Sequence, residues 1–431
     1  MLKRGIEKWD LVLLVINATI GAGIFGLPSE IFRRIGAYSL GAFVACAALV
    51  LIIILCFAEV SSRFDKTGGP YIYTLTAFGR LPAFIVGWLL LLSRIFNYAT
   101  LINMMVTYLS FFYHKLDDPA PRIMIILVVT TFLSYINYIG VRNIARLSNI
   151  TTVAKLVPLA IFIIAGLFFV NTASFDTSKT PTVTSFSNAV LLLVFAFGGF
   201  ESVLVNSGEI KNPAKTLPFA LFTATAVIAI FYILIQVVCI GTLPGLAGST
   251  RPVAEAASLF MGNLGGKMVA AGAFISILGT LNVLLFSGSR LPYAFSEEGQ
   301  LPRWFSRVHR KYKTPTVSLI TVSVLVAITS ITFSFLSALT VATIIRVLVY
   351  LFVCASLIML RTKLPDQTGF YKLTSGKLLA FLGIAICIWL LSAAKPVELR
   401  NVAILIGIGL VIYVLQPAFR QPNKRSTDNK E

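Results

Sequence analysis

Long apolar runs, each of about 20 residues or more, follow one another along most of this chain, separated by short charged or Pro- and Gly-rich segments. An α-helix of that length crosses the ~30 Å hydrocarbon core of a bilayer. Hydrophobic residues make up 57% of the chain, which leaves too little polar surface for a water-soluble globule. We therefore predict an all-α membrane protein with about twelve transmembrane helices. The expected spans lie near residues 10–36, 38–62, 80–112, 121–142, 148–170, 187–208, 216–242, 265–295, 316–335, 337–361, 376–394 and 399–417.

Glycines interrupt two of these runs. The first span contains Thr19–Pro28, with the sequence TIGAGIFGLP, and the sixth contains Phe195–Glu201, with the sequence FAFGGFE. In hydrocarbon each unpaired amide or carbonyl costs several kcal/mol, so an irregular backbone persists only where it lines a cavity, binds a ligand or is repaired by neighbours. Two interrupted helices at corresponding places of two half-chains are typical of the midplane substrate site of a secondary transporter.

The chain divides into two similar halves around these interruptions. Spans one to five, within residues 10–171, and spans six to ten, within 185–361, each open with a glycine-broken helix and contain a long third helix preceded by an amphipathic connector. Their opposite topology predicts an inverted repeat with a pseudo-two-fold axis in the membrane plane. Two further spans at 376–417 fall outside the repeat, and residues 1–9 and the polar tail 418–431 flank the whole.

The net charge of +19 follows this topology. If the N-terminus is cytoplasmic, most of the 36 Lys and Arg residues lie on the cytoplasmic side, above all in the loop 290–313 and the tail 420–430. This is the positive-inside pattern, so both termini are expected in the cytoplasm. Anionic lipids explain the basic loops better than nucleic acid does, because no basic soluble domain carries a groove. We expect a multi-pass plasma-membrane protein, and the short tails favour a bacterial inner membrane.

Candidate catalytic and metal-binding groups are scarce. The five cysteines are widely spaced in apolar stretches, and the two histidines lie in loops. No metal-ligand cluster, haem site or Ser-His-Asp set can be assembled at membrane depth from these residues. The sequence therefore predicts neither a metal nor another cofactor and argues against an enzyme. It does not specify an oligomeric state.

The first break suits the charged groups of an α-amino acid. The amides of Gly21, Ala22 and Gly23 lie at the N-terminus of the half-helix that follows, where partial positive charge favours a carboxylate. The half-helix ending near Ile20 and the carbonyls freed around Phe195–Phe197 have the opposite polarity, which suits an ammonium group. The alternative is that the glycines only allow helices to pack closely. A corresponding break in the other half favours the substrate site.

Six different short motifs follow one another along the chain. They are IGAGIF at Ile20–Phe25, TGGPYIY at Thr67–Tyr73, FAFGGFE at Phe195–Glu201, EIKNP at Glu209–Pro213, YAF at Tyr293–Phe295 and GQLP at Gly299–Pro302. In these motifs the chain resembles the amino acid–polyamine–organocation superfamily of transporters over essentially its whole length. The resemblance implies a leucine-transporter-type fold, a five-plus-five inverted repeat with helices 1 and 6 broken. It also implies rocking-bundle alternating access, an amino acid or decarboxylated amine as cargo, and an aromatic gate at Phe195.

Lys155 is expected about 10 Å from the cytoplasmic end of the fifth span. The resemblance implies that a lysine here puts its ammonium where sodium-coupled relatives hold a sodium ion, so that transport is independent of sodium. The implied partners are carbonyls near Ala18–Gly21 and a hydroxyl such as Ser276 or Thr280. The alternative is a lysine that snorkels to the interface.

Arg94 and Arg346 are two further cations within expected spans, where a central charge costs about 2.5–3.5 kcal/mol and usually marks function. Each either binds an acidic group of the substrate, pairs with Glu201 or caps carbonyls in the bundle. Glu201 either hydrogen-bonds the freed amides of the second break or carries a coupling proton. Asn97, one turn beyond Arg94 on the same helix face, either donates to the substrate or stabilises the bundle. Two fixed cations disfavour a cationic substrate.

Together these features predict a secondary active transporter that moves amino acids across the plasma membrane by alternating access, independent of sodium, by exchange or proton symport. The alternative within transport is a polyamine or amine exchanger. A receptor or channel is a competing class, but paired helix breaks and the lack of a sensory domain argue against it. The predicted substrate-binding residues are Thr19, Ile20, Gly21, Ala22, Gly23, Ile24, Asn97, Phe195, Ala196, Phe197 and Gly198; the predicted coupling residues are Lys155, Ser276, Thr280 and Glu201, and Arg94 and Arg346 are substrate-binding or structural cations.

Overall fold

The computed structural model describes residues 7–64, 68–139, 144–204, 210, 212–364 and 371–415, without the side chains of 144–154 and 213–214. The predicted tail 418–431, most of segment 1–9 and the motif residues Thr67 and Glu209 lie outside the described residues. Regular structure in the described ranges is helical. The helices are α1 Lys8–Thr19, α2 Gly23–Ile35, α3 Ser39–Ser62, α4 Pro70–Phe78, α5 Arg80–Leu109, α6 Pro119–Ile139, α7 Ile144–Leu167, α8 Val183–Phe197, α9 Phe200–Leu204, α10 Pro213–Thr242, α11 Pro252–Glu297, α12 Thr316–Thr332, α13 Phe335–Lys363, α14 Gly376–Ser392 and α15 Pro396–Val414, with short 3-10 turns between some of them.

Eight helical segments of the described chain are long and apolar enough to cross a membrane. Shorter apolar helices add to them at 155–167, 316–332 and 376–392. One of the eight runs from Gly23 to Ser62, because a 3-10 turn at Gly36–Tyr38 joins α2 to α3 where the sequence predicts two separate spans. The predicted helical character is confirmed, and the total of about twelve spans stays a prediction.

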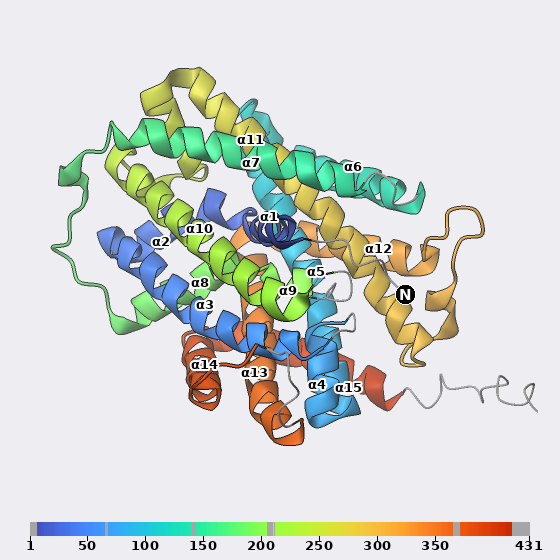
Figure 1. Cartoon of the computed structure of the whole chain (residues 1–431). Coiled ribbons are helices and arrows are strands. Elements are labelled where there is room, and N and C mark those ends of the chain that lie inside the picture. Colours follow the sequence, from blue (N-terminus) through green and yellow to red (C-terminus); the bar gives the residue numbers. More distant parts are fainter. Residues whose placement is uncertain are drawn as a thin grey trace, which may run out of the picture.

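Helix α5 lies at the centre of the bundle. In its most apolar stretch 83% of the residues are buried, against 22% in α6 and 11% in α15. It packs against α11, α12 and α13, while α1 packs against α9 and α10. Figure 1 shows α1 near the middle of the molecule beside α9 and α10, with α6 along one edge. Polar side chains on α5 are therefore shielded from the surrounding lipid.

The two halves contain a similar bend before their long helices. The short α4 ends at Phe78, Gly79 has a φ of 90°, and α5 follows. Within α11, Gly262 has a φ of 67° and a ψ of −176°, so the helix bends there between a short and a long part. Glycine adopts positive φ with little strain. In both halves a glycine with positive φ thus precedes the long helix.

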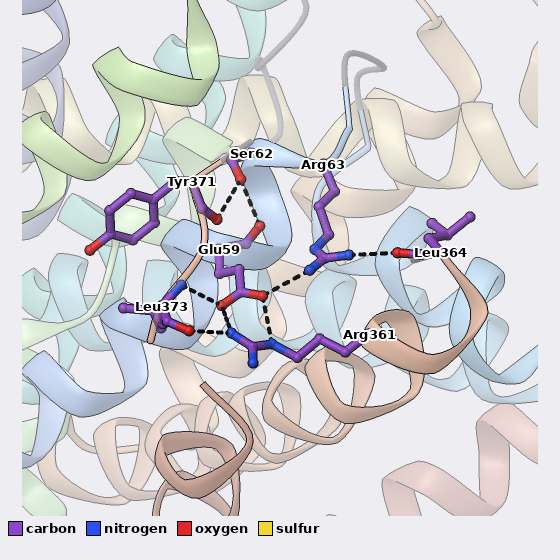
Figure 2. A network of polar contacts seen from close by, with 7 residues as sticks. All are labelled: Glu59, Ser62, Arg63, Arg361, Leu364, Tyr371 and Leu373. Carbon is purple, nitrogen blue, oxygen red and sulfur yellow. Dashed lines mark hydrogen bonds and ion pairs between the residues drawn. The ribbon is translucent and has the colours of Figure 1, made fainter. Parts of the chain in front are cut away.

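A buried carboxylate joins α3 to α13. Glu59 is 0% exposed, and it accepts hydrogen bonds from Arg361 at 2.6 and 2.8 Å, from Arg63 at 2.9 Å and from the Leu373 amide at 3.0 Å. Arg63 also donates to the Leu364 carbonyl at 3.1 Å, and Arg361 to the Leu373 carbonyl at 2.6 Å. Figure 2 shows Glu59 between the two guanidinium groups. We call these residues the Glu59 cluster, which sequence analysis did not single out.

Candidate functional site

Two breaks interrupt the helices where the sequence predicts them. α1 ends at Thr19 and α2 begins at Gly23, and the intervening Ile20 is extended, with φ −72° and ψ 98°. α8 ends at Phe197 and α9 begins at Phe200. In both breaks the backbone leaves the helical path within the interior of the bundle, so the freed amides and carbonyls need partners other than their own helix.

The two breaks lie directly against each other, and we call the place where they meet the crossing. Gly199 has a φ of 122°, a region that L-residues rarely adopt, and a Cβ there would overlap the carbonyl oxygen of Ala18 in the last turn of α1. Gly23 also lies against the other break, because a Cβ at that position would be 2.9 Å from the Cα of Ala196. The structure thus brings the two predicted substrate-binding segments together.

The two glycines of the first break have different surroundings. Gly23 is tightly packed, which fits the alternative that a small residue lets helices approach. A Cβ at Gly21 would meet only the Thr19 carbonyl oxygen among the described residues, at 4.0 Å, so Gly21 borders open space. That space lies at the N-terminal end of α2, where free amides favour an anion. Packing accounts for Gly23, whereas the position that a Cβ of Gly21 would take is open.

Lys155 lies at the C-terminal end of α1. It is 1% exposed, and its ammonium donates hydrogen bonds to the carbonyls of Asn17 at 2.8 Å and Ile20 at 2.9 Å. The C-terminal end of a helix carries partial negative charge, which favours a buried cation there. The carbonyl ligands expected near Ala18–Gly21 thus include Ile20, and the burial excludes a lysine that snorkels to the interface.

The hydroxyl partners expected for Lys155 need correction. Thr280 donates to the carbonyl of Ser276, one turn earlier in α11, at 3.0 Å, a local bond common for threonine in helices. The Ser276 hydroxyl is buried without a hydrogen-bond partner in the described part of the chain. Neither hydroxyl therefore binds the ammonium, whose hydrogen bonds to described residues both go to α1.

Tyr232 of α10 reaches both breaks. Its buried hydroxyl lies 3.0 Å from the carbonyl oxygen of Ala196 and 3.4 Å from that of Thr19. Its ring packs edge-on against Phe197 at a centroid distance of 5.2 Å. Sequence analysis missed this residue, because a single tyrosine within an apolar helix gives no periodic signal that separates a functional contact from ordinary packing.

Arg346 of α13 forms a buried ion pair with Glu201. Its Nε donates to a Glu201 carboxylate oxygen at 3.1 Å, and its Nη1 donates to the Phe195 carbonyl at 3.0 Å. Its Nη2 donates to the side-chain oxygen of Asn97 at 3.4 Å. Arg346 thus combines two of the roles considered for it, pairing with Glu201 and capping a carbonyl.

Glu201 has the structural role considered for it. Its second oxygen accepts a hydrogen bond from the freed amide of Gly199 at 2.8 Å and one from the Tyr350 hydroxyl at 3.3 Å. The carboxylate therefore stabilises the open backbone of the second break as well as pairing with Arg346.

Three of the carbonyls expected to hold an ammonium group, those of Ile20, Phe195 and Ala196, already accept hydrogen bonds from side chains. Lys155, Arg346 and Tyr232 reach carbonyls in both breaks. A carbonyl oxygen has two lone pairs, so a substrate ammonium would share these acceptors with protein donors. Binding of a positive group is therefore less favoured here than the sequence alone predicts.

Arg94 of α5 has no comparable partners. It is 8% exposed, yet its guanidinium makes no hydrogen bond or ion pair with residues that the structure describes. The charges of Glu201 and Arg346 both act on it. Asn97, one turn along α5, contacts Arg346. We call Arg94, Asn97, Glu201 and Arg346 the Glu201 cluster, in which two guanidinium groups accompany one carboxylate.

The other predicted substrate-binding residues are buried at the crossing. Ala22 and Ile24 are buried, and the Thr19 hydroxyl lacks a hydrogen-bond partner within the described ranges. The Phe195 ring lies 3.3 Å from the Cβ position of Gly23 and 5.4 Å from the Arg346 guanidinium, measured to the ring centre. Its role as a gate stays a prediction. Among the described residues, no group of three or more His, Cys, Asp or Glu could hold a metal ion.

Comparison with known proteins identifies the class of protein to which this chain belongs. The model of the amino acid permease family matches residues 6–414. The chain is 27% identical to the branched-chain amino acid permease BcaP of Bacillus subtilis (strain 168), over 96% of this chain and 93% of that protein. It is 28% identical to the serine/threonine exchanger SteT of the same organism, over 74% of each. It is 29% identical to the cystine/glutamate transporter of Homo sapiens, over 86% of this chain and 76% of that one. The chain belongs to the amino acid permease family.

This membership confirms the resemblance to the amino acid–polyamine–organocation superfamily that the sequence motifs indicate. The family and the three relatives are transporters, so the chain is a transmembrane permease and not an enzyme. The structure adds the arrangement of charges around the two breaks, which bears on what the permease carries.

Proposed function

We propose that this permease carries α-amino acids across the plasma membrane by alternating access. The membrane we propose is the inner membrane of a bacterium. The observation that carries the proposal is the crossing of two broken helices beside open space at Gly21. Interrupted helices at such a place supply backbone groups of both polarities to a small zwitterion. The three relatives agree with it, since their names give amino acids as cargo.

The fold we propose around this site has about twelve spans in a leucine-transporter-type arrangement, with the inverted repeat in 10–171 and 185–361 and both termini in the cytoplasm. Two features support it. Each half opens with a broken helix, and each has a glycine bend before its long helix, at Gly79 and Gly262.

We place the α-carboxylate of the cargo at the amides beside Gly21, at the start of α2. The ammonium group then shares carbonyls of the two breaks with the protein donors already there. Phe195, next to both, closes over the cargo. A polyamine or amine exchanger is less well supported, because Lys155 and Arg346 already place positive charge at those carbonyls.

Coupling follows from Lys155. Its ammonium is a fixed cation bonded to the end of α1, so a sodium ion in the same pocket would be repelled. We therefore propose transport without sodium, driven by exchange or by proton symport.

Uptake into proteoliposomes tests the proposal. The purified permease is given a panel of labelled amino acids and polyamines in sodium-free buffer, with and without internal amino acid and with and without a pH gradient. We expect uptake of amino acids without sodium, stimulated by internal cargo or by the pH gradient. Uptake of amines alone, or strict dependence on sodium, would contradict the proposal.

A further inference from the structure

We propose that Arg94 binds a second anionic group on the cargo, so that the permease selects amino acids with an acidic side chain. This inference rests on the proposed function and deepens it. Arg94 is 8% exposed and makes no hydrogen bond or ion pair with the described residues. A guanidinium stays protonated in proteins, and a buried charge without a counter-charge is costly. A ligand that brings a carboxylate would supply that counter-charge.

Arg346 is less suited to this purpose, because it already pairs with Glu201 and each of its three guanidinium nitrogens already donates a hydrogen bond. Its three nitrogens donate to Glu201, to the Phe195 carbonyl and to Asn97. Glu201 is equally committed, since its second oxygen accepts from the Gly199 amide. The cluster as a whole therefore keeps one positive charge, and that charge belongs to Arg94.

The position of Arg94 puts it beside the crossing. It shares a face of α5 with Asn97, which accepts a hydrogen bond from Arg346 at 3.4 Å. Arg346 in turn donates to the Phe195 carbonyl, in the last turn of α8 before the second break. The stem of Arg94 also packs near α11, because its Cβ lies 3.5 Å from the Cβ position of Gly288, which is ordinary van der Waals contact.

The two carboxylates of an acidic amino acid would then bind to different groups of the protein. The α-carboxylate takes the amides at the start of α2, and the side-chain carboxylate takes the guanidinium of Arg94, whose planar fork binds a carboxylate through two parallel hydrogen bonds. A neutral cargo of the same shape would leave Arg94 uncompensated. Glutamate and glutamine form such a pair, as do aspartate and asparagine.

The experiment measures uptake of labelled L-glutamate and L-glutamine by the wild-type permease in proteoliposomes, in sodium-free buffer. We expect at least about tenfold preference for glutamate, expressed as the ratio of kcat/KM values. Arg94→Gln should lose that preference and still transport glutamine, whereas Arg94→Lys should keep part of it, because the charge remains without the fork. Thermal unfolding in detergent shows whether each variant is folded.

Arg80→Gln is the matched control, because it removes the same charge from an exposed position at the start of the same helix. It should keep the wild-type preference. Equal uptake of both amino acids by the wild type would overturn the inference, as would an equal loss of both in a folded Arg94→Gln protein. Either result leaves amino acid transport standing. Uptake of no amino acid at all would instead contradict the proposed function.

Discussion

Glu59 and Glu201 are both buried carboxylates near two arginines, but only Glu59 is hydrogen-bonded to both of them. In the Glu59 cluster each guanidinium binds the carboxylate and also a backbone carbonyl (Figure 2). In the Glu201 cluster Arg346 binds the carboxylate, while Arg94 binds none of the described residues. Each cluster has one surplus positive charge, and only the Glu59 cluster hydrogen-bonds all of its cations.

This difference separates a structural from a functional use of buried charge. The Glu59 cluster links the end of α3 to α13 and to the chain around Leu373. Its ion pairs and hydrogen bonds therefore connect elements of the fold. The Glu201 cluster lies where two helices are broken, and the Arg94 guanidinium makes no hydrogen bond or ion pair with the described residues. We therefore expect variants of the first cluster to change stability and variants of the second to change what is transported.

The largest effect is expected for Glu59→Gln. It leaves two guanidinium groups without their counter-charge, and breaking a buried ion pair costs about 3–5 kcal/mol. Thermal unfolding of the purified variant in detergent should occur at a markedly lower temperature, and the folded fraction should keep the wild-type substrate preference. An unchanged unfolding temperature, or a changed substrate preference, would contradict a purely structural role of the Glu59 cluster.

Glu201→Gln should destabilise somewhat less, by about 2–3 kcal/mol, because Arg346 keeps its bonds to the Phe195 carbonyl and Asn97. An acidic cargo should partly restore stability, since it returns an anion to the cluster. The measurement is the rise in unfolding temperature when L-glutamate is added, with Glu59→Gln as the matched control. A rise no larger than that of the control would show that the cluster does not face the cargo.

Lys155→Ala extends the comparison to a third buried cation, one bonded to carbonyls alone. Losing two charge-assisted hydrogen bonds to α1 should cost about 1.5–3 kcal/mol and loosen the contact between α1 and α7. We expect a slower turnover with an unchanged ranking of substrates, measured as sodium-free uptake across a range of pH. Normal rates at every pH would remove Lys155 from the coupling mechanism.

The smallest effect should distinguish the two glycines of the first break. Gly23→Ala places a methyl group against Ala196, and such overpacking costs about 1–3 kcal/mol. Gly21→Ala points into open space, so its stability should stay within about 0.5 kcal/mol of the wild type while KM for the cargo rises. Unfolding temperature and uptake kinetics check both. Equal losses of stability in the two variants would contradict the assignment of the open side to Gly21.

Local signals account for what the sequence could predict. Gly21 and Gly199 mark the breaks because glycine in an apolar run is itself unusual, and each break follows directly from its own few residues. The carbonyl partners of Lys155 are not a local signal, since Lys155 lies 135 residues from Ile20, and it was the family resemblance that implied them.

Contacts between distant segments account for what it could not. The sequence left open whether Arg346 or Arg94 pairs with Glu201, because 145 residues separate Arg346 from Glu201 and no pattern links them. Glu59 and Arg361 are 302 residues apart, so the Glu59 cluster was missed altogether. The hydroxyl partners predicted for Lys155 were wrong for a different, local reason. Thr280 donates to the carbonyl of its own preceding turn, and the Ser276 hydroxyl has no hydrogen-bond partner among the described residues.

The central claim, that the unpaired cation of the Glu201 cluster is there for the cargo, is tested most directly by binding. Isothermal titration calorimetry of the purified permease with L-glutamate and with L-glutamine gives both affinities without the need for transport. We predict at least about tenfold tighter binding of glutamate to the wild type, which is about 1.4 kcal/mol, and equal affinities in Arg94→Gln. Equal affinities in the wild type, or a preference that survives in Arg94→Gln, would contradict the account.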